Sequence, residues 1–150
     1  MYNVLSAATG ILSPDQKIQA LNKPNYPETM LRYKQALNFI GTSEIELADH
    51  QIQAILSLEP EWIPALTLKA ILFARRLQYA PAELLFKHVL QSTPDDINIL
   101  ANLGNLYYMW DRLDEAEEML TRVLASNPQH LTSLVNLGLV YSKQKRFKAV

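Results

Sequence analysis

The feature that most constrains this sequence is a repeat step of 34 residues. Residues of one kind recur at this step in several parallel series, both small residues and large ones. Three of these series are Pro60, Pro94, Pro128; Ala36, Ala70, Gly104, Gly138; and Phe39, Phe73, Tyr107, Tyr141. A fixed period of roughly 20 to 50 residues indicates stacked copies of one supersecondary unit, none of which can bury its apolar face alone.

Each repeat contains the pattern of two amphipathic helices. Between residues 97 and 110, the large apolar residues fall at the three- and four-residue spacing of one helix face. Residues 112–125 show the same periodicity, and their opposite face is acidic. Pro128 disfavours helical backbone in the residue before it, so the second helix is expected to end there. The repeating unit is therefore predicted to be a helical hairpin.

Local signals predict where these helices approach each other and where they begin. Gly104 and Gly138 stand at positions where a larger side chain would hold the two helices of a hairpin apart. Ser43 and Glu46 have the spacing of a capping box, in which each side chain satisfies the free amide of the other residue. A helix is therefore expected to begin at Ser43.

This arrangement resembles the tetratricopeptide repeat. The third repeat carries most of the family's pattern, with Leu100, Leu103-Gly104, Tyr107, Ala116, Leu120 and Pro128. The resemblance implies an all-α fold, a right-handed superhelical solenoid of antiparallel helix pairs. The expected divisions are N-terminal capping helices in 1–28, then repeats in 29–62, 63–96, 97–130 and 131–150.

Two parts of the sequence depart from this pattern. Lys69 occupies a place where the family has an apolar residue, and nothing in the sequence explains it. The fourth repeat is expected to have a first helix through about Lys143 and only the start of a second, where Phe147 and Val150 would begin the buried face. The sequence therefore looks cut from a longer array. If it is a whole protein, its open end is expected to attract another copy or a partner.

Composition argues against several classes of function. The chain has 14 basic and 15 acidic residues, a net charge of −1, so nucleic acid is not an expected partner. Absence of cysteine excludes disulfides and thiolate metal sites, and the three histidines are too far apart in sequence to form a ligand pair. Glycine-rich phosphate loops and nucleophile motifs are missing. We expect no enzyme activity, no catalytic residue, no metal and no cofactor.

The sequence also bears on the membrane. Its uncharged stretches fall short of the roughly 18 to 20 apolar residues that span a bilayer. The N-terminal stretch lacks the basic start and the cleavage site of a signal peptide. We therefore expect no membrane insertion and a cytoplasmic location.

The resemblance implies that the first helix of each repeat lines a concave groove for a peptide or a partner helix. Carried over residue by residue, the expected groove positions are Tyr33, Leu37, Ile71, Arg75, Asn98, Asn102, Asn105, Tyr108, Met109, Asn136, Leu139 and Lys143. Tyr108 and Met109 are the expected anchors, because aromatic and methionine side chains are enriched at interfaces.

Two kinds of groove in the family can be compared with this sequence. One is a clamp of Lys, Asn and Arg side chains around a peptide's C-terminal carboxylate. That clamp is missing, because its positions hold Tyr33, Leu37, Leu68, Asn98 and Asn102. The other is a ladder of asparagines whose amides bond a peptide backbone. Asn102 and Asn136 match two of its rungs, whereas Lys34 and Leu68 break it.

The expected function is a non-catalytic scaffold that binds a peptide or helix of a protein partner. Two alternatives stay open. The chain fits the repeat region of a larger enzyme or of a secretion or assembly complex, and it also fits self-assembly into a homo-oligomer through the open C-terminal repeat. Residues 131–150 carry a net charge of +4, which is interpreted as a solvated basic turn.

Overall fold

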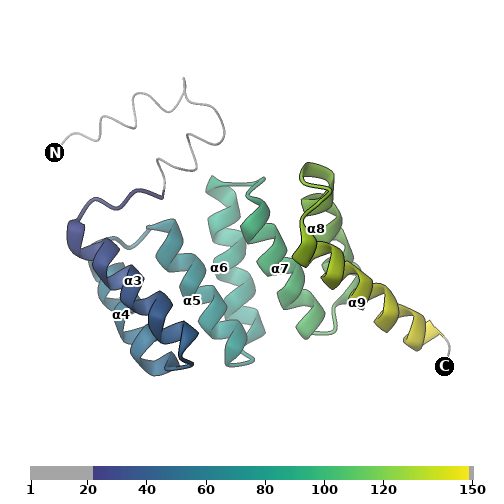
Figure 1. The fold of residues 1–150 in the computed structure, drawn as a ribbon, viewed down its shortest axis with the longest axis horizontal. Coiled ribbons are helices and arrows are strands. Elements are labelled where there is room, and N and C mark those ends of the chain that lie inside the picture. Colours follow the sequence, from purple (N-terminus) through teal and green to yellow (C-terminus); the bar gives the residue numbers. More distant parts are fainter. Residues whose placement is uncertain (1–21, 149–150) are drawn as a thin grey trace, which may run out of the picture. The chain divides into compact units, whose positions relative to one another are not determined.

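The computed structural model describes residues 22–148, and these residues form helices joined by short turns (Figure 1). The helices are α3 (Pro27–Gly41), α4 (Ile45–Leu58), α5 (Ile63–Arg75), α6 (Tyr79–Ser92), α7 (Ile97–Met109), α8 (Leu113–Ser126) and α9 (Leu131–Lys148). The described part of the chain contains no strand, so the predicted all-α fold is confirmed. The capping helices expected in 1–28 fall largely on residues 1–21, which lie outside the described residues.

The chain divides into two compact units, Met1–Leu72 and Phe73–Val150. In the first unit α3 packs along α4. In the second, α7 packs along α8, α8 along α9, and α6 along α7. In these pairs, helices that are neighbours in sequence are neighbours in space, as the hairpin pattern predicts.

Apolar side chains from α3, α4 and α5 form the core of the first unit. One cluster of buried residues is Ala36, Ala48, Ile52, Leu68 and Leu72. The two alanines in it are fully buried, which lets α3 and α4 approach closely. A second cluster surrounds Trp62, and the Tyr33 ring meets the Trp62 ring edge to face, with centroids 5.2 Å apart.

In the second unit, the contact between α7 and α8 depends on a glycine. A Cβ atom on Gly104 would lie 2.8 Å from Cγ of Leu120, which is fully buried. The expectation that a side chain here would separate the helices is confirmed. A Cβ atom on Gly138 would meet no atom within 4 Å, and the described residues include no second helix of the fourth repeat, so the same expectation stays a prediction for α9.

Each of the first three hairpins turns at a residue in left-handed conformation. The non-glycine residues with positive φ are Ser43 (63°), Leu77 (59°) and Asp111 (59°), separated by the repeat step. At the first of them, the Glu44 N–H donates to the Phe39 carbonyl over 2.8 Å, and the Ser43 N–H donates to the Ile40 carbonyl over 3.1 Å. These two bonds define a Schellman motif, which ends a helix and satisfies its last carbonyls.

The Schellman motif overturns the capping box expected at Ser43. Ser43 belongs to the end of α3, and the N-cap of α4 is Glu44, which makes no side-chain capping bond. The same residues carry both signals, and the sequence pattern alone does not separate a helix start from the turn just before it. The outcome follows from the left-handed backbone at Ser43.

The fourth hairpin turn, predicted after about Lys143, is not formed. The position equivalent to Asp111 is Lys145, and α9 continues through it to Lys148. A left-handed conformation costs a non-glycine residue about 1 kcal/mol or more, which packing of the following helix repays in the other hairpins.

The structure explains the lysine in the second repeat. The ammonium group of Lys69, on α5, lies 2.6 Å from a carboxylate oxygen of Asp49 on α4, and both side chains are largely buried. The departure from the family's apolar pattern is therefore an ion pair between neighbouring helices. Of the described helices, none is long and apolar enough to cross a membrane.

Candidate binding face

The predicted groove residues of the first unit differ in how far they reach the surface. Tyr33 and Ile71 pack against the core cluster around α3, α4 and α5. Burial raises the pKa of Tyr33. Leu37 is 44% exposed. In this unit the structure therefore gives two of the three predicted residues a packing role and leaves Leu37 at the surface.

α7 carries most of the predicted positions in the second unit. Its start is fixed by Asp96, whose carboxylate accepts bonds from the backbone N–H groups of Asn98, at 2.9 Å, and Ile99, at 3.3 Å. The buried side of α7 faces α6 and α8, and the predicted positions lie on the opposite side of the helix. On that side Asn98, Asn105 and Met109 are exposed, whereas Asn102 and Tyr108 are half-buried.

α9 adds the remaining positions and contacts α7. Leu139 is 45% exposed, while Asn136 and Lys143 are half-buried. Arg75, at the end of α5, is exposed and belongs to the second unit. We define the candidate face as the predicted residues on α7 and α9: Asn98, Asn102, Asn105, Tyr108, Met109, Asn136, Leu139 and Lys143.

Two side-chain amides on this face have no partner. Within residues 22–148, the amides of Asn102 and Asn136 make no hydrogen bond, although both side chains are half-buried. Asn105 makes only a long contact of 3.9 Å from its amide nitrogen to the Met109 sulfur. A polar group that is partly removed from water without a partner loses hydrogen-bond energy, which a ligand can restore.

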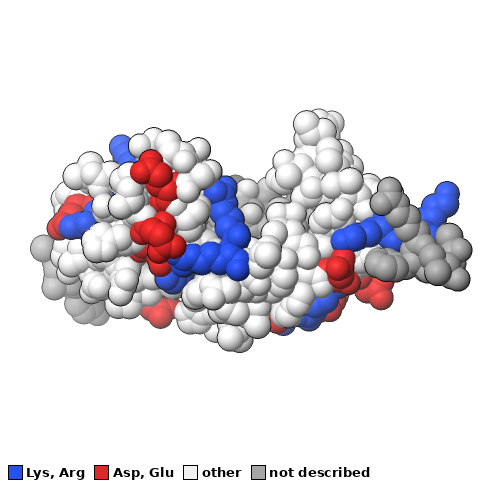
Figure 2. Space-filling model, turned by 90° about the horizontal axis from the view of Figure 1, so that it is seen from below, with Lys and Arg blue, Asp and Glu red and all other residues white. Residues whose placement is uncertain are grey.

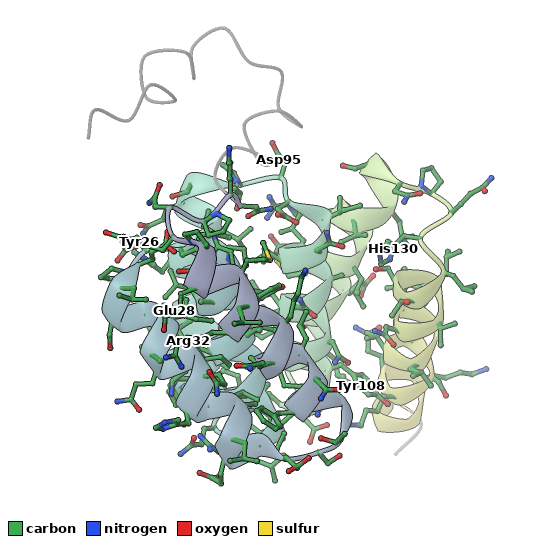
Figure 3. All side chains as sticks on the ribbon, turned by 60° about the vertical axis from the view of Figure 1, so that its left-hand side comes forward. Tyr26, Glu28, Arg32, Asp95, Tyr108 and His130 are labelled. Atoms are coloured by element: carbon green, nitrogen blue, oxygen red, sulfur yellow. The ribbon has the colours of Figure 1, made fainter. Side chains whose placement is uncertain are left out.

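A lysine ties the end of α7 to α9. The Lys143 ammonium lies 4.8 Å from the centroid of the Tyr108 ring and forms an ion pair with Asp111. The hydrogen bond to Asp111 raises the pKa of Lys143. Figure 3 shows Tyr108 at the C-terminal end of α7. The contact holds the ring of Tyr108 beside α9.

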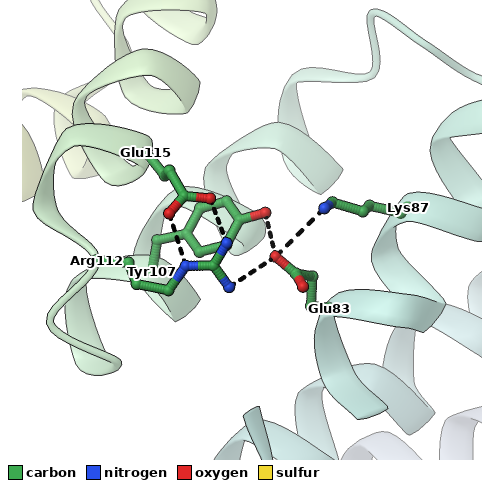
Figure 4. Close-up of polar contacts among 5 residues, drawn as sticks. All are labelled: Glu83, Lys87, Tyr107, Arg112 and Glu115. Atoms are coloured by element: carbon green, nitrogen blue, oxygen red, sulfur yellow. Dashed lines mark hydrogen bonds and ion pairs between the residues drawn. The ribbon is translucent and has the colours of Figure 1, made fainter. Parts of the chain in front are cut away.

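A polar cluster that the sequence analysis missed joins α6, α7 and α8 (Figure 4). Its centre is the Glu83 carboxylate, which accepts a 2.5 Å bond from the Tyr107 hydroxyl and lies 3.0 Å from Arg112 and 3.4 Å from Lys87. Arg112 also bonds Glu115 over 2.6 Å.

Each member of this cluster shifts the ionisation of another. Burial by itself raises the pKa of Glu83, but the bond from Tyr107 and the charges of Arg112 and Lys87 together lower it. Burial and Glu83 raise the pKa of Tyr107 above its usual value. The cluster therefore holds Glu83 ionised and Tyr107 neutral, which suits a structural contact between helices.

One signal in the sequence indicates this cluster. Acidic residues recur at the repeat step, as Asp49, Glu83 and Glu117. Each contacts the first helix of the next repeat: Asp49 bonds Lys69, Glu83 bonds Tyr107, and Glu117 accepts a 3.0 Å bond from Gln144. Glu117, on the acidic face of α8, is therefore also bonded to α9.

Charge on the surface is mixed. Figure 2 shows Lys and Arg side chains next to Asp and Glu side chains, with wide areas that carry no charge. On α3, Arg32 pairs with Glu28 one helical turn away over 2.7 Å (Figure 3). Among the described residues, no group of three or more His, Asp or Glu side chains is placed to hold a metal ion.

Comparison with known proteins agrees with the helical hairpins. A family model described as tetratricopeptide repeat matches residues 77–149. Among curated protein sequences, none matches this chain.

Three solved structures illustrate the likeness in fold. The first TPR of Spaghetti (RPAP3), bound to the HSP90 peptide SRMEEVD, has a TM-score of 0.70 at 14% identity, covering 79% of this chain and 94% of that one. Pseudomonas aeruginosa pilF has a TM-score of 0.70 at 22% identity, covering 79% of this chain and 54% of that one.

MamA from Desulfovibrio magneticus RS-1 has a TM-score of 0.69 at 17% identity, covering 98% of this chain and 85% of that one. At these identities the likeness shows the fold alone. The family match identifies residues 77–149 as tetratricopeptide repeat sequence, and the solved structures show that the described helices have the tetratricopeptide repeat fold.

Proposed function

We propose that this protein is a non-catalytic scaffold that binds a segment of a partner protein on the candidate face. The observation that carries the proposal is the pair of unpartnered amides, Asn102 and Asn136, at equivalent positions of α7 and α9. Each amide offers a donor and an acceptor, as a peptide bond does. Two such groups one repeat apart suit the backbone of an extended segment that crosses both helices.

The surroundings of the amides favour an uncharged segment. α7 contains no charged residue, and α9 contains no acidic one. The basic side chain on the face, Lys143, is already paired with Asp111. Tyr108 and Leu139 add apolar area for the segment's side chains. An affinity in the micromolar range, about −8 kcal/mol, is expected of such a mixed surface.

The Spaghetti structure provides a contrast in ligand chemistry. Its peptide, SRMEEVD, ends in acidic residues and a C-terminal carboxylate. At the positions of the family's carboxylate clamp, this chain has no basic side chain, as Tyr33, Leu37 and Leu68 illustrate. We therefore propose an internal segment of the partner as the ligand rather than its C-terminus.

Affinity capture tests this proposal. The chain is immobilised beside a variant with Asn102→Ala, Tyr108→Ala and Asn136→Ala, and proteins retained from a native-source lysate are identified by mass spectrometry. The proposal predicts that specific partners are retained by the wild type and lost from the variant. Circular dichroism establishes that both proteins are folded.

The matched control carries three exposed changes on the second helices of the same unit, Leu84→Ala, Glu118→Ala and Thr121→Ala. This control is expected to retain the partners. If instead the control loses them and the triple variant of the candidate face keeps them, binding belongs to the outer helices and the proposal is wrong.

A further inference from the structure

A short segment before α3 is bonded to the turn between α4 and α5. We define this segment as the strap, residues 22–26, which lead directly into α3 (Figure 1). The backbone N–H of Asn25 donates to Oε1 of Glu59 over 2.7 Å. From the same turn, the indole N–H of Trp62 donates to the Asn22 carbonyl over 3.1 Å. One acceptor and one donor of the turn therefore hold the backbone of the strap.

The equivalent positions of the second unit are used differently. One repeat later, Glu59 and Trp62 correspond to Thr93 and Asp96. The Thr93 hydroxyl donates to the Val89 carbonyl over 3.2 Å, and the Asp96 carboxylate caps α7. Both side chains thus bond within their own segment. The two bonds to the strap are therefore a feature of the first unit and do not follow from the repeat pattern.

The strap lies at the surface, whereas the side chains that hold it are buried. Within the strap, Lys23, Asn25 and Tyr26 are exposed. Glu59 is 6% exposed and Trp62 is 5% exposed. A segment that buries few apolar groups opens locally at a low cost in free energy. The two hydrogen bonds, rather than apolar packing, are therefore expected to determine how often the strap opens.

The Glu59 carboxylate is only half satisfied by this contact. Its Oε1 accepts the Asn25 N–H, whereas its Oε2 is buried and has no hydrogen-bond partner. A buried oxygen without a partner lacks the hydrogen bonds that water would give it. Lifting of the strap would admit water to the carboxylate and so offset the bond that is lost. This decreases the free-energy difference between the closed and the open strap.

We propose that the strap opens and closes as one unit while α3, α4 and α5 stay folded. In the closed form, Glu59 and Trp62 bond its backbone. In the open form, the Glu59 carboxylate and the Trp62 indole N–H are released to bond water or another polar group. This device does not depend on the proposed function, because no residue of the candidate face takes part in it.

Hydrogen exchange of the whole 150-residue chain, followed by NMR at low urea concentrations, tests the proposal. The Asn25 amide and the Trp62 indole N–H report on the two bonds, and the amide of Ile52, a fully buried residue of α4, reports on unfolding of the helices. We expect the two strap protons to share one opening constant and to be at least about a hundredfold less protected than Ile52. Their exchange is expected to be insensitive to urea, because opening exposes little surface.

Variants separate one concerted opening from two independent bonds. Glu59→Ala removes the acceptor of Asn25 and leaves the bond of Trp62 in place, yet both protons are expected to lose protection at least about tenfold while Ile52 stays protected. Glu59→Gln keeps an oxygen acceptor without the charge and is expected to lower both protections severalfold. Where Glu59→Ala is unfolded, Glu59→Gln provides the same comparison. The matched control, Glu118→Gln, removes one negative charge from an exposed position of α8 and is expected to change neither proton.

Three results would overturn the proposal. One is an unchanged protection of the Trp62 indole N–H in folded Glu59 variants whose Asn25 amide has lost protection. Another is wild-type exchange of both strap protons only through the urea-dependent opening that also exposes Ile52. The third is a difference of more than about tenfold between the opening constants of the two strap protons in the wild type.

Discussion

Two glycines at equivalent positions experience opposite surroundings. Gly104 faces the buried Leu120, whereas Gly138 faces no atom within 4 Å. Alanine at position 104 overpacks the α7–α8 contact by about 1–3 kcal/mol, which exceeds the helix propensity gain of about 1 kcal/mol. Alanine at position 138 adds its higher helix propensity without overpacking any neighbour.

Urea unfolding checks this pair. Gly104→Ala is expected to lower the free energy of unfolding by about 1 kcal/mol, and Gly138→Ala to raise it by about 0.5–1 kcal/mol. If both substitutions stabilise the protein equally, Leu120 does not restrict position 104 and the description of the α7–α8 contact is incorrect.

The ionised carboxylate of Glu83 contributes to the stability of the folded protein. Its pKa is lowered in the folded state, so its stabilising contribution is present above the ordinary glutamate pKa, about 4.3, and is lost as the pH falls through the folded pKa. The wild type is therefore expected to lose more stability than Glu83→Gln between about pH 6 and pH 3. Other carboxylates titrate in both proteins and cancel in the comparison.

The measurement is the urea midpoint of each protein across this pH range. The difference between the urea midpoints of the wild type and Glu83→Gln should become smaller as the pH falls. Two parallel curves would show that the contacts of Glu83 with Tyr107 and Arg112 do not favour its charged form.

The contacts between individual side chains were the feature that the sequence predicted least. The recurrence of Asp49, Glu83 and Glu117 is visible in the sequence, but their partners are not, because each partner lies on a neighbouring helix. The sequence did not explain Lys69 either, because its partner, Asp49, lies on the neighbouring helix α4. Periodicity identifies which face a residue occupies, and only the packing of helices identifies what it meets.

At the scale of helices, α7 offers a direct test of its start. Asp96 accepts bonds from two backbone N–H groups of the first turn, while Asp95 beside it has a side chain that is 94% exposed. Asp96→Ala is expected to lower the free energy of unfolding by about 1 kcal/mol. Asp95→Ala is expected to change it by less than about 0.5 kcal/mol.

Both variants remove one negative charge, so a comparison by thermal or urea unfolding isolates the cap. Equal losses of stability in the two variants would mean that the charge near the helix N-terminus, rather than the hydrogen bonds of Asp96, stabilises α7.

The helices themselves were well predicted, and their ends less so. Apolar periodicity and the prolines located the hairpins, because burial of a helix stripe dominates their stability. The turns depend on left-handed residues such as Leu77, which no sequence preference indicates. The continuation of α9 past Lys145 was likewise not predicted.

At the scale of the whole chain, the repeat step was sufficient to predict the fold, because it places the apolar residues on the same helix faces in each repeat. The predicted groove residues differ in their exposure. Asn98 and Asn105 are exposed, whereas Tyr33 and Ile71 pack against the core. The helix face of a residue follows from its spacing, but its distance from the core depends on the size of its neighbours.

The central claim is that a partner binds the first-helix side of the second unit. Site-specific photo-crosslinking tests it most directly, with a photoreactive phenylalanine at Asn105, exposed on α7, or at Glu118, exposed on α8. After irradiation in a native-source lysate, covalent adducts are expected from position 105 and not from position 118. Adducts from position 118 alone would place the partner on the second helices and contradict the account.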